Sequence, residues 1–170
     1  TPAGAHVPVL LAEVLEALAP RPGDTAFDAT VGHGGHARAI LDRIAPGGHY
    51  CGSDLDAGEL ARTRERLAGA AVPVALHEAP YSEIRRLLDS EGLAGADVIL
   101  ADLGVSSMQI DDPSRGFSYK HDGPLDMRLG PGVPAGAAEV LSAIDLPALD
   151  EVLRELGDEE DHREVALAIL

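Results

Sequence analysis

Residues 25–37 read TAFDATVGHGGHA and connect a short apolar strand to a helix through a glycine-rich loop. We expect the strand over residues 25–30, the loop over 32–36 and the helix over 37–45. The loop matches the pattern G-x-G-x-x-G/A. Its glycines permit a tight turn and a close approach of the backbone to a ligand, and the helix N-terminus beyond it offers free N–H groups. The pattern predicts a nucleotide-binding loop, with a tight turn that binds nothing as the alternative.

Strands and helices alternate on both sides of this loop. Further strands are expected over residues 49–53, 72–76 and 97–101, and helices over 10–18, 57–67 and 82–88. Alternation of this kind predicts βαβ units around a parallel sheet. Pro73 cannot donate a ladder hydrogen bond, which favours an edge position for the strand that contains it.

The character of the chain changes after residue 129. A Pro/Gly-rich run, 130–136, precedes three expected helices, with no strand among them, over residues 137–144, 146–156 and 161–170. We therefore expect an α/β protein of two parts. Residues 1–129 form the N-terminal part of a Rossmann-like core with a parallel sheet, and residues 130–170 begin a helical inserted domain.

Acidic residues end two expected strands, at Asp54 and Asp102, and a third, Asp28, lies inside the strand over residues 25–30. Asp54 ends the strand after the glycine loop, where a carboxylate can accept both hydroxyls of an adenosine ribose. Asp28 lies within its strand, a few positions before Gly32, where nicotinamide-binding folds are normally apolar. Carboxylates stabilise a cationic ligand and repel the two phosphates of a dinucleotide. The residues thus favour S-adenosylmethionine, a sulfonium that also carries an amino group, over NAD.

A long polar segment, residues 102–129, follows the strand over 97–101. Loops of this length are uncommon in compact domains and are usually functional or disordered. In open α/β sheets, ligands bind beyond the carboxyl ends of the strands. The aromatic side chains of Phe117 and Tyr119, together with several apolar residues, indicate that the segment packs. We expect a functional loop that starts at Asp102.

The overall charge argues against non-specific binding to nucleic acid. The chain has 29 acidic and 13 basic residues and a formal net charge of −16, whereas phosphate backbones are bound by clustered Lys and Arg. A nucleic-acid substrate would have to be read locally, or by basic surface outside this chain. Cys51 is the single cysteine, so no internal disulfide is expected and a reducing compartment is favoured.

Membrane and metal sites are not expected. No stretch approaches the ~20 apolar residues that cross a bilayer, and no signal peptide precedes Thr1. The chain begins without Met and ends in an apolar run, so both ends look cut, and we expect a cytoplasmic protein or a piece of one. His33 and His36 lack a third nearby ligand, so no metal is expected.

The segment DLGVSSMQIDDPSRGFSYKHDGPLDMR, residues 102–128, resembles almost residue for residue the signature of a bacterial family, the ribosomal RNA small subunit methyltransferase H family. The resemblance extends from HVPVLLAEVLEAL at 6–18 through DATVGHGGHARAIL at 28–41. It implies a Rossmann-like enzyme that uses S-adenosylmethionine to methylate N4 of a cytidine in small-subunit (16S) ribosomal RNA. The family continues well beyond this length, so the chain resembles a truncated member, and the activity of this piece stays open.

By position, the resemblance implies contacts with S-adenosylmethionine at Gly34, Gly35, His36, Asp54, Tyr81, Asp102 and Gln109. Tyr81 stands where the family usually has Phe and keeps a ring face for stacking on adenine; packing in the core is the alternative. The segment over 157–163, GDEEDHR, is more acidic than the family's turn at this place, which weakens the case for an RNA-facing role there. The implied partner is small-subunit ribosomal RNA or the assembled small subunit, and a homodimer is compatible with it.

Asp102 is the catalytic candidate. The exocyclic amine of cytosine is a weak nucleophile, and an acceptor that takes its N–H and aligns its lone pair increases its reactivity. The target base must leave its stack, and aromatic side chains can then hold it. The residues expected to assist or to bind RNA, with surface ion pairs as the alternative for the cations, are Ser106, Ser107, Arg115, Phe117, Tyr119, Lys120 and Arg128. Two other functions stay open: an NAD-dependent oxidoreductase and a non-catalytic nucleotide- or RNA-binding fragment.

Overall fold

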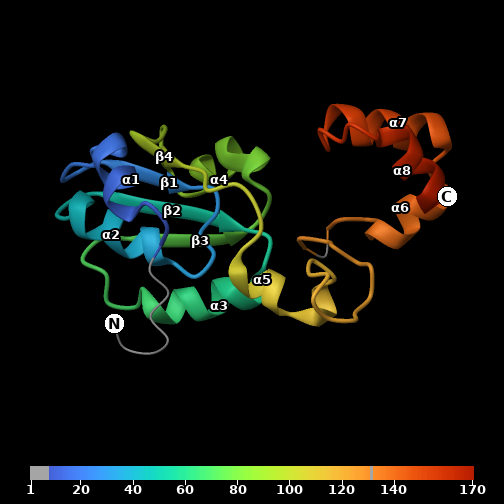
Figure 1. Cartoon of the computed structure of the whole chain (residues 1–170). Helices are drawn as coiled ribbons and strands as arrows, with labels where there is room; N and C mark the ends of the chain where they lie inside the picture. Colours follow the sequence, from blue (N-terminus) through green and yellow to red (C-terminus); the bar gives the residue numbers. More distant parts are fainter. Residues whose placement is uncertain (1–7, 131) are drawn as a thin grey trace. The chain divides into compact units, whose positions relative to one another are not determined.

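A computed structural model describes residues 8–130 and 132–170 (Figure 1). The contacts divide the chain into two compact units, one that extends to Gly104 and one over Val105–Leu170. His6 and Val7, which open the resembling segment, lie outside the described residues, as do Pro131 of the expected boundary and the side chain of Met108. The domain boundary expected after residue 129 stays a prediction.

The first unit is built on a parallel four-stranded sheet with the strand order β3-β2-β1-β4. The strands are β1 (Thr25–Asp28), β2 (His49–Asp54), β3 (Val74–Glu78) and β4 (Val98–Leu100). Phe27 of β1 lies between Cys51 of β2 and Ile99 of β4. The expected α/β class and parallel sheet are confirmed, and β3, which follows Pro73, is an edge strand of this sheet as expected. The first strand ends two residues earlier than expected, at Asp28.

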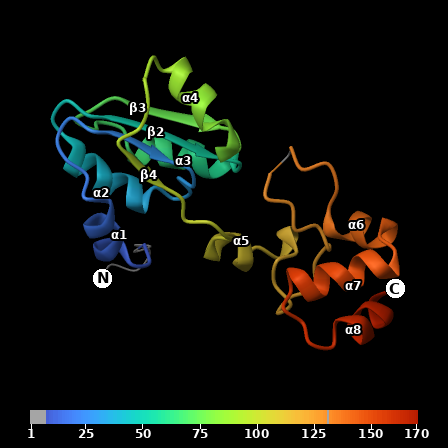
Figure 2. The same ribbon diagram turned by 90° about the horizontal axis from the view of Figure 1, so that it is seen from above.

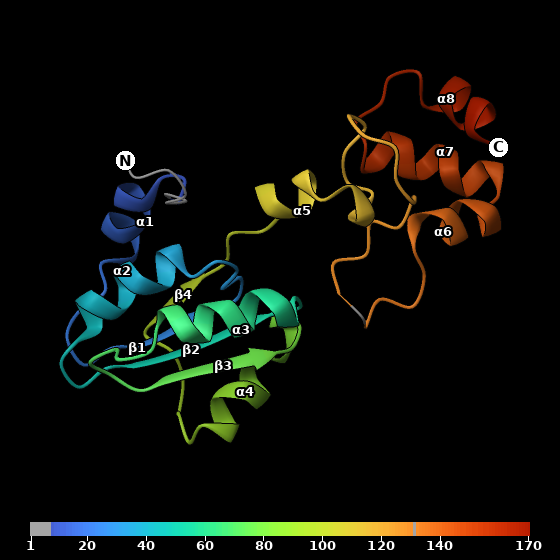
Figure 3. The same ribbon diagram turned by 90° about the horizontal axis from the view of Figure 1, so that it is seen from below.

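Helices cover both faces of the sheet, as Figures 2 and 3 show. On one face lie α1 (Leu11–Leu18), α2 (Gly35–Ile44) and α3 (Ala57–Arg66); on the other lies α4 (Ile84–Ser90), which follows the 3₁₀ turn η1 (Tyr81–Glu83). The core of the first face includes Leu15, Ala26, Ile40, Ile44, Tyr50 and Val98. The core of the second face includes Phe27, Cys51, Leu87 and Leu88. Successive residues of β1 and β2 point to opposite faces, so one sheet supports two separate apolar clusters.

The second unit contains α5 (Ser107–Asp111), the 3₁₀ turn η2 (Pro113–Arg115), α6 (Ala137–Ala143), α7 (Leu146–Glu155) and α8 (His162–Ile169). The three C-terminal helices lie within a residue or two of their expected bounds. Asp145 caps α7, because its carboxylate accepts the N–H of Ala148 at 2.9 Å. The buried side chains of Leu149 in α7 and Ala166 in α8 belong to the core of this unit.

The segment over 105–129 is more structured but less packed than expected. It holds α5 and η2, and Met127 N–H donates to the carbonyl of Arg115 at 2.9 Å. The ring of Phe117 is half-buried, but Tyr119 is 97% exposed. The expectation that both aromatic side chains pack is therefore wrong for Tyr119. Backbone hydrogen bonds, more than apolar burial, hold this segment.

In the part of the chain that the structure describes, no helix is both long and apolar enough to cross a membrane.

Candidate functional site

The parallel sheet brings the expected site residues of the first unit to one edge. Asp28 ends β1 and Asp54 ends β2. Tyr81 begins the turn after β3, and Asp102 follows β4 by two residues. Because the carboxyl ends of parallel strands lie at the same edge, these four residues lie at the edge of the sheet from which the glycine loop leads into α2.

The glycine loop is held from β2 and from α3. The Gly32 N–H donates to Oδ2 of Asp54 at 2.7 Å. The Thr63 hydroxyl of α3 donates to the Gly32 carbonyl at 2.7 Å, and Nη1 of Arg66 donates to the His33 carbonyl at 3.0 Å. The loop is therefore fixed before any ligand binds, which is the preorganisation that ligand binding favours.

The glycines of this loop are required by the chain itself. Gly34 has a φ of 78°, and a Cβ at this position would lie 2.6 Å from Cγ2 of Thr63. A Cβ on Gly35 would lie 2.4 Å from Cγ of Pro8. The sequence interpretation attributed the glycines to a tight turn and to ligand approach. The structure adds close packing against α3 and Pro8 as a reason for them.

We expect Gly34→Ala to destabilise the protein by about 1–3 kcal/mol, because the change combines a left-handed backbone with overpacking. Thr63 cannot rotate away without cost, since it is fully buried and its hydroxyl holds the Gly32 carbonyl. Urea denaturation monitored by circular dichroism measures the loss. Gly69→Ala is the control, because Gly69 also has a positive φ, of 83°, but a Cβ there meets no atom within 4 Å. An equal loss in both variants would contradict the steric argument.

Asp28 lies beneath the loop. Its side chain is 1% exposed, its Oδ2 accepts the Tyr50 hydroxyl at 2.7 Å and its Oδ1 accepts the Thr30 N–H at 3.0 Å. Burial raises the pKa of Asp28 above its ordinary value, and the two hydrogen bonds oppose that rise. The sequence interpretation placed this carboxyl beside the amino group of a ligand. In the structure its partners belong to the chain, so it supports the loop from below.

The raised pKa of Asp28 gives an expected pH dependence of stability. The folded chain binds the proton of this carboxyl more tightly than the unfolded chain. The resulting stabilisation is fully present below the ordinary value of 3.8 and is lost as the pH rises through the folded value. Relative to Asp28→Asn, which does not titrate, the wild type should lose unfolding free energy as the pH rises above 3.8. Urea denaturation of both proteins at several pH values measures this difference, and a constant difference would contradict it.

The Asp54 carboxylate holds the loop and also has acceptor sites for a ligand. Its Oδ2 accepts the Gly32 N–H, and its Oδ1 accepts the Asp56 N–H at 3.0 Å. Each carboxylate oxygen has two acceptor sites, so both oxygens can accept one further hydrogen bond. The side chain is half-buried at the end of β2. It can therefore accept two neighbouring hydroxyls without releasing the loop.

Tyr81 and His36 lie at the same edge. Tyr81 is 55% exposed, so its ring is not packed in the core and a face remains for stacking. His36 is half-buried, and its Nε2 has no hydrogen-bond partner among the described residues. His33 lies nearby in the sequence, with its Nδ1 3.9 Å from Oε2 of Glu59. No group of three His, Cys, Asp or Glu within residues 8–130 and 132–170 is arranged to hold a metal ion.

Asp102 is exposed and anchored through its backbone. Its N–H donates to the Thr30 hydroxyl oxygen at 2.8 Å, and its side chain is open to solvent. An exposed carboxylate on an anchored backbone can accept a hydrogen bond from an incoming group.

Two expected site residues of the second unit bond to each other. Ser106 Oγ accepts the Gln109 N–H at 3.2 Å, and Gln109 Oε1 accepts the Ser106 N–H at 2.9 Å. This capping box begins α5. Ser107, the first residue of that helix, is exposed.

The expected cations of the second unit differ in their surroundings. Nη2 of Arg115 donates to the carbonyls of Arg128 and Leu129 at 3.2 and 3.3 Å. Arg128 forms a bidentate ion pair with Asp126, at 2.8 and 2.6 Å, which lowers the pKa of Asp126 to about 2. Both arginines thus stabilise the segment. Lys120 is exposed beside Tyr119 and is better placed for an external phosphate.

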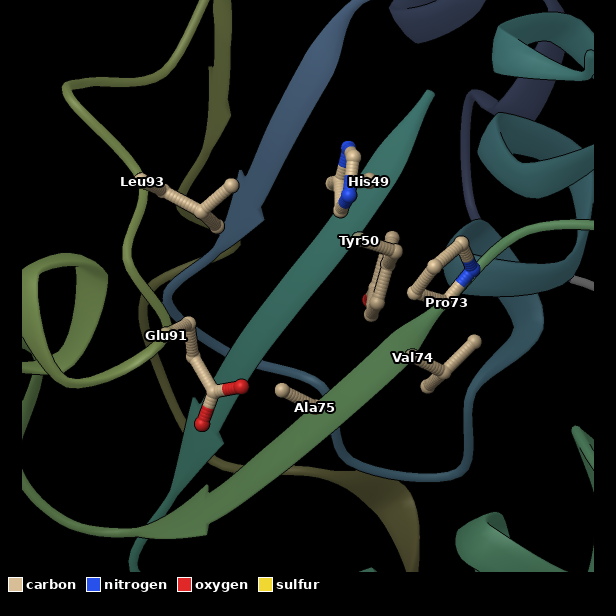
Figure 4. A pocket seen from close by; sticks show the side chains of 7 residues that line it. All are labelled: His49, Tyr50, Pro73, Val74, Ala75, Glu91 and Leu93. Carbon is tan, nitrogen blue, oxygen red and sulfur yellow. The ribbon is translucent and has the colours of Figure 1, made fainter. Parts of the chain in front are cut away.

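A cavity of about 250 Å³ lies elsewhere in the first unit. Figure 4 shows its lining: His49 and Tyr50 of β2, Pro73 to Ala75 at the start of β3, and Glu91 and Leu93 after α4. The lining residues of β2 and β3 belong to the amino ends of these strands, whereas the glycine loop and Asp54 lie at the carboxyl ends. We therefore do not assign this cavity to the candidate site.

Comparison with known proteins shows which family the chain belongs to. The family model described as the MraW methylase family matches residues 3–170. The chain belongs to the MraW methylase family. The match covers the glycine loop, all the acidic strand ends and the segment over 105–129, and it confirms the resemblance seen in the sequence.

Curated proteins of related sequence carry a common name. The chain is 44% identical to Ribosomal RNA small subunit methyltransferase H 1 of Agathobacter rectalis, over 99% of this chain and 49% of that protein. It is 46% identical to Ribosomal RNA small subunit methyltransferase H of Halorhodospira halophila, over 97% of this chain and 51% of that protein. The chain spans about half the length of the curated relatives it matches. It is also similar to the solved structure of TrmN from Thermus thermophilus, at a TM-score of 0.43 and 26% identity over 49% of this chain and 26% of that chain.

Sequence reasoning missed the residues that hold the loop of this MraW methylase family member. Tyr50, Thr63 and Arg66 contact residues 22, 31 and 33 positions away. In the sequence, Tyr50 belongs to an apolar strand and Arg66 to an arginine-rich helix. Nothing in these patterns indicates that either residue makes a specific contact near the loop. A polar Thr63 on the buried side of an amphipathic helix was the one available signal.

Proposed function

We propose that this chain carries the S-adenosylmethionine-binding part of a methyltransferase that modifies N4 of a cytidine in small-subunit ribosomal RNA. The observation that carries the proposal is the preorganised glycine loop with the Asp54 carboxylate at its side and the exposed Asp102 at the same edge of the sheet. The names of the curated relatives support the ribosomal RNA substrate. We propose a cytoplasmic protein, with ribosomal RNA or the assembled small subunit as its partner.

The described residues fit S-adenosylmethionine. Negative charge near the loop favours a ligand with a sulfonium and an ammonium group, and it disfavours the two phosphates of NAD. Asp54 keeps two acceptor sites for the ribose hydroxyls, and Tyr81 offers a ring face for adenine. Gly34 ends the loop, and Gly35 and His36 begin α2 behind it; all three are proposed as contacts of the ligand. Asp102 and Gln109 are proposed as further contacts because of the resemblance of the sequence to the family.

When bound, S-adenosylmethionine supplies an electrophilic methyl group. Asp102 accepts a hydrogen bond from an N–H of the cytosine amine, so that the N4 lone pair leaves its conjugation with the ring and points toward the donor; as N4 gains the methyl group, Asp102 takes the proton that N4 loses. Ser106 and Ser107 are proposed to assist near the amine. Phe117 or Tyr119 stacks on the base once it has left its helix. Lys120 is proposed to contact the RNA backbone, and Arg115 and Arg128 are retained as further candidates for phosphate contacts. In this proposal residues 1–129 are the methyltransferase core and residues 130–170 the start of a helical insertion.

Calorimetric titration tests the cofactor assignment. The 170-residue chain, and the longest polypeptide its gene encodes, are titrated with S-adenosylmethionine and separately with NAD. We expect both proteins to bind S-adenosylmethionine and neither to bind NAD. Binding of NAD alone would overturn the proposal in favour of an oxidoreductase. Absence of S-adenosylmethionine binding in both proteins would overturn the cofactor assignment. The alternative of a non-catalytic fragment would then be favoured.

A further inference from the structure

A chain of hydrogen bonds runs from the core to the catalytic candidate. The Tyr50 hydroxyl donates to Asp28, and Asp28 accepts the Thr30 N–H. The Thr30 hydroxyl oxygen in turn accepts the Asp102 N–H at 2.8 Å. The chain therefore joins three strands, because Tyr50 belongs to β2, Asp28 to β1, and Asp102 follows β4.

At the end of the β1–β4 pairing, the side chain of Thr30 accepts a hydrogen bond that a backbone carbonyl accepts in a regular sheet. The Ala29 N–H donates to the Leu100 carbonyl at 2.8 Å, which continues the ladder past the last paired residue of β1. In a regular parallel ladder, the next donor, Asp102 N–H, would bond to the backbone carbonyl of Ala29. Here a side-chain oxygen accepts this N–H instead. The hydroxyl thus determines where the backbone of Asp102 leaves the sheet.

The position of Thr30 is itself restricted. Its N–H is held by Asp28, which is 1% exposed, and Tyr50, also 1% exposed, holds the other oxygen of that carboxyl. A β-branched side chain has few χ1 rotamers, so the hydroxyl direction follows from the fixed backbone. Asp102, by contrast, is exposed and has no core packing of its own. Its placement depends on this one anchor more than on burial.

We propose that Thr30 is a positioning residue for methyl transfer: it places Asp102 through the Asp102 N–H without contacting the substrate. The inference rests on the proposed function, because it assumes that the Asp102 carboxylate accepts the N–H of the target amine. A displacement of about 1 Å at a reacting group can lower a rate by about a hundredfold. Loss of the Thr30 hydroxyl should therefore reduce turnover without removing any group that touches the reactants.

Two substitutions separate the hydroxyl from the shape of the side chain. Thr30→Val keeps the β-branched volume and removes the acceptor, whereas Thr30→Ser keeps the acceptor. Thr25→Val, at the opposite end of β1, is the matched control for a threonine-to-valine change in the same strand. Tyr50→Phe releases Asp28 at the far end of the chain of hydrogen bonds, and it serves as a second route if Thr30→Val does not fold.

The experiment has two readouts. Hydrogen exchange of the Asp102 amide in the 170-residue chain reports the hydrogen bond directly. Transfer of a radiolabelled methyl group to small-subunit ribosomal RNA, by the longest polypeptide that the gene encodes, reports turnover. We expect Thr30→Val to accelerate exchange of this amide and to lower turnover about a hundredfold. We expect Thr30→Ser and Thr25→Val to stay within a few-fold of the wild type, and Tyr50→Phe to reduce turnover less than Thr30→Val.

A double-mutant cycle distinguishes positioning from general destabilisation. If Thr30 acts through Asp102, Thr30→Val should lower turnover no further in the Asp102→Asn background. Additive effects, an inactive Thr30→Ser, or unchanged exchange of the Asp102 amide in Thr30→Val would each overturn the inference. Failure of the wild type to bind S-adenosylmethionine would instead overturn the proposed function. Full turnover of Asp102→Asn would overturn the inference and the role of Asp102 as the acceptor, because Thr30 would then have no catalytic group to place, but it would leave the methyltransferase assignment standing.

Discussion

Replacing Asp54 by alanine is expected to weaken the binding of S-adenosylmethionine about a hundredfold or more. The substitution removes two acceptor sites for the ribose hydroxyls and the tether to the Gly32 N–H. A hydrogen bond to a charged group contributes about 1.5–3 kcal/mol, and each 1.4 kcal/mol is about tenfold in affinity. Two lost bonds therefore predict a large effect. Calorimetric titration of the 170-residue chain measures it.

The controls for this variant separate charge from geometry. Glu78→Ala removes a negative charge from the end of the neighbouring strand β3 and should change the affinity only slightly. Asp54→Asn keeps the size of the side chain and one acceptor oxygen, so its affinity should lie between those of the wild type and Asp54→Ala. Thermal unfolding of each variant shows that the chain remains folded. Equal weakening by Glu78→Ala would mean that only the overall charge of this edge matters.

Replacing Asp102 by asparagine is expected to lower the rate of methyl transfer by about 10²–10⁴-fold, the usual contribution of a positioned proton acceptor. The amide retains the side-chain volume and the backbone hydrogen bond to Thr30, so the loss isolates the charge of the carboxylate. The rate is measured with small-subunit ribosomal RNA and the longest polypeptide that the gene encodes, at saturating S-adenosylmethionine. An undiminished rate would exclude Asp102 as the acceptor.

The matched control for this prediction lies in the second unit. Asp122 is an exposed carboxylate of the segment over 105–129, and Asp122→Asn removes the same charge from the chain. We expect it to retain the wild-type rate. A comparable loss in Asp122→Asn would indicate that the negative charge of the chain, and not the position of Asp102, governs turnover.

The order of the elements could be predicted closely because it depends on local patterns. Apolar periodicity predicted α2 and α3 within two residues of their ends, and Pro73 indicated the edge strand β3. Exposure within the long segment was harder to predict. An aromatic side chain such as that of Tyr119 is expected to pack, but Tyr119 is 97% exposed. Turns and backbone hydrogen bonds order this segment without a large apolar core.

The sequence was sufficient for the fold class, the family and the set of acidic strand ends, since strands, helices, glycines and acids are read from residues that are close along the chain. The tertiary structure alone decided what each acid does. Asp28 is turned into the core by Tyr50, Asp54 holds the loop, and Asp102 stays exposed on a backbone that Thr30 anchors. The physical reason is that these contacts join residues 22 or 72 positions apart. They form only when β2 and β4 pair with β1, and no local pattern specifies which side chains meet there.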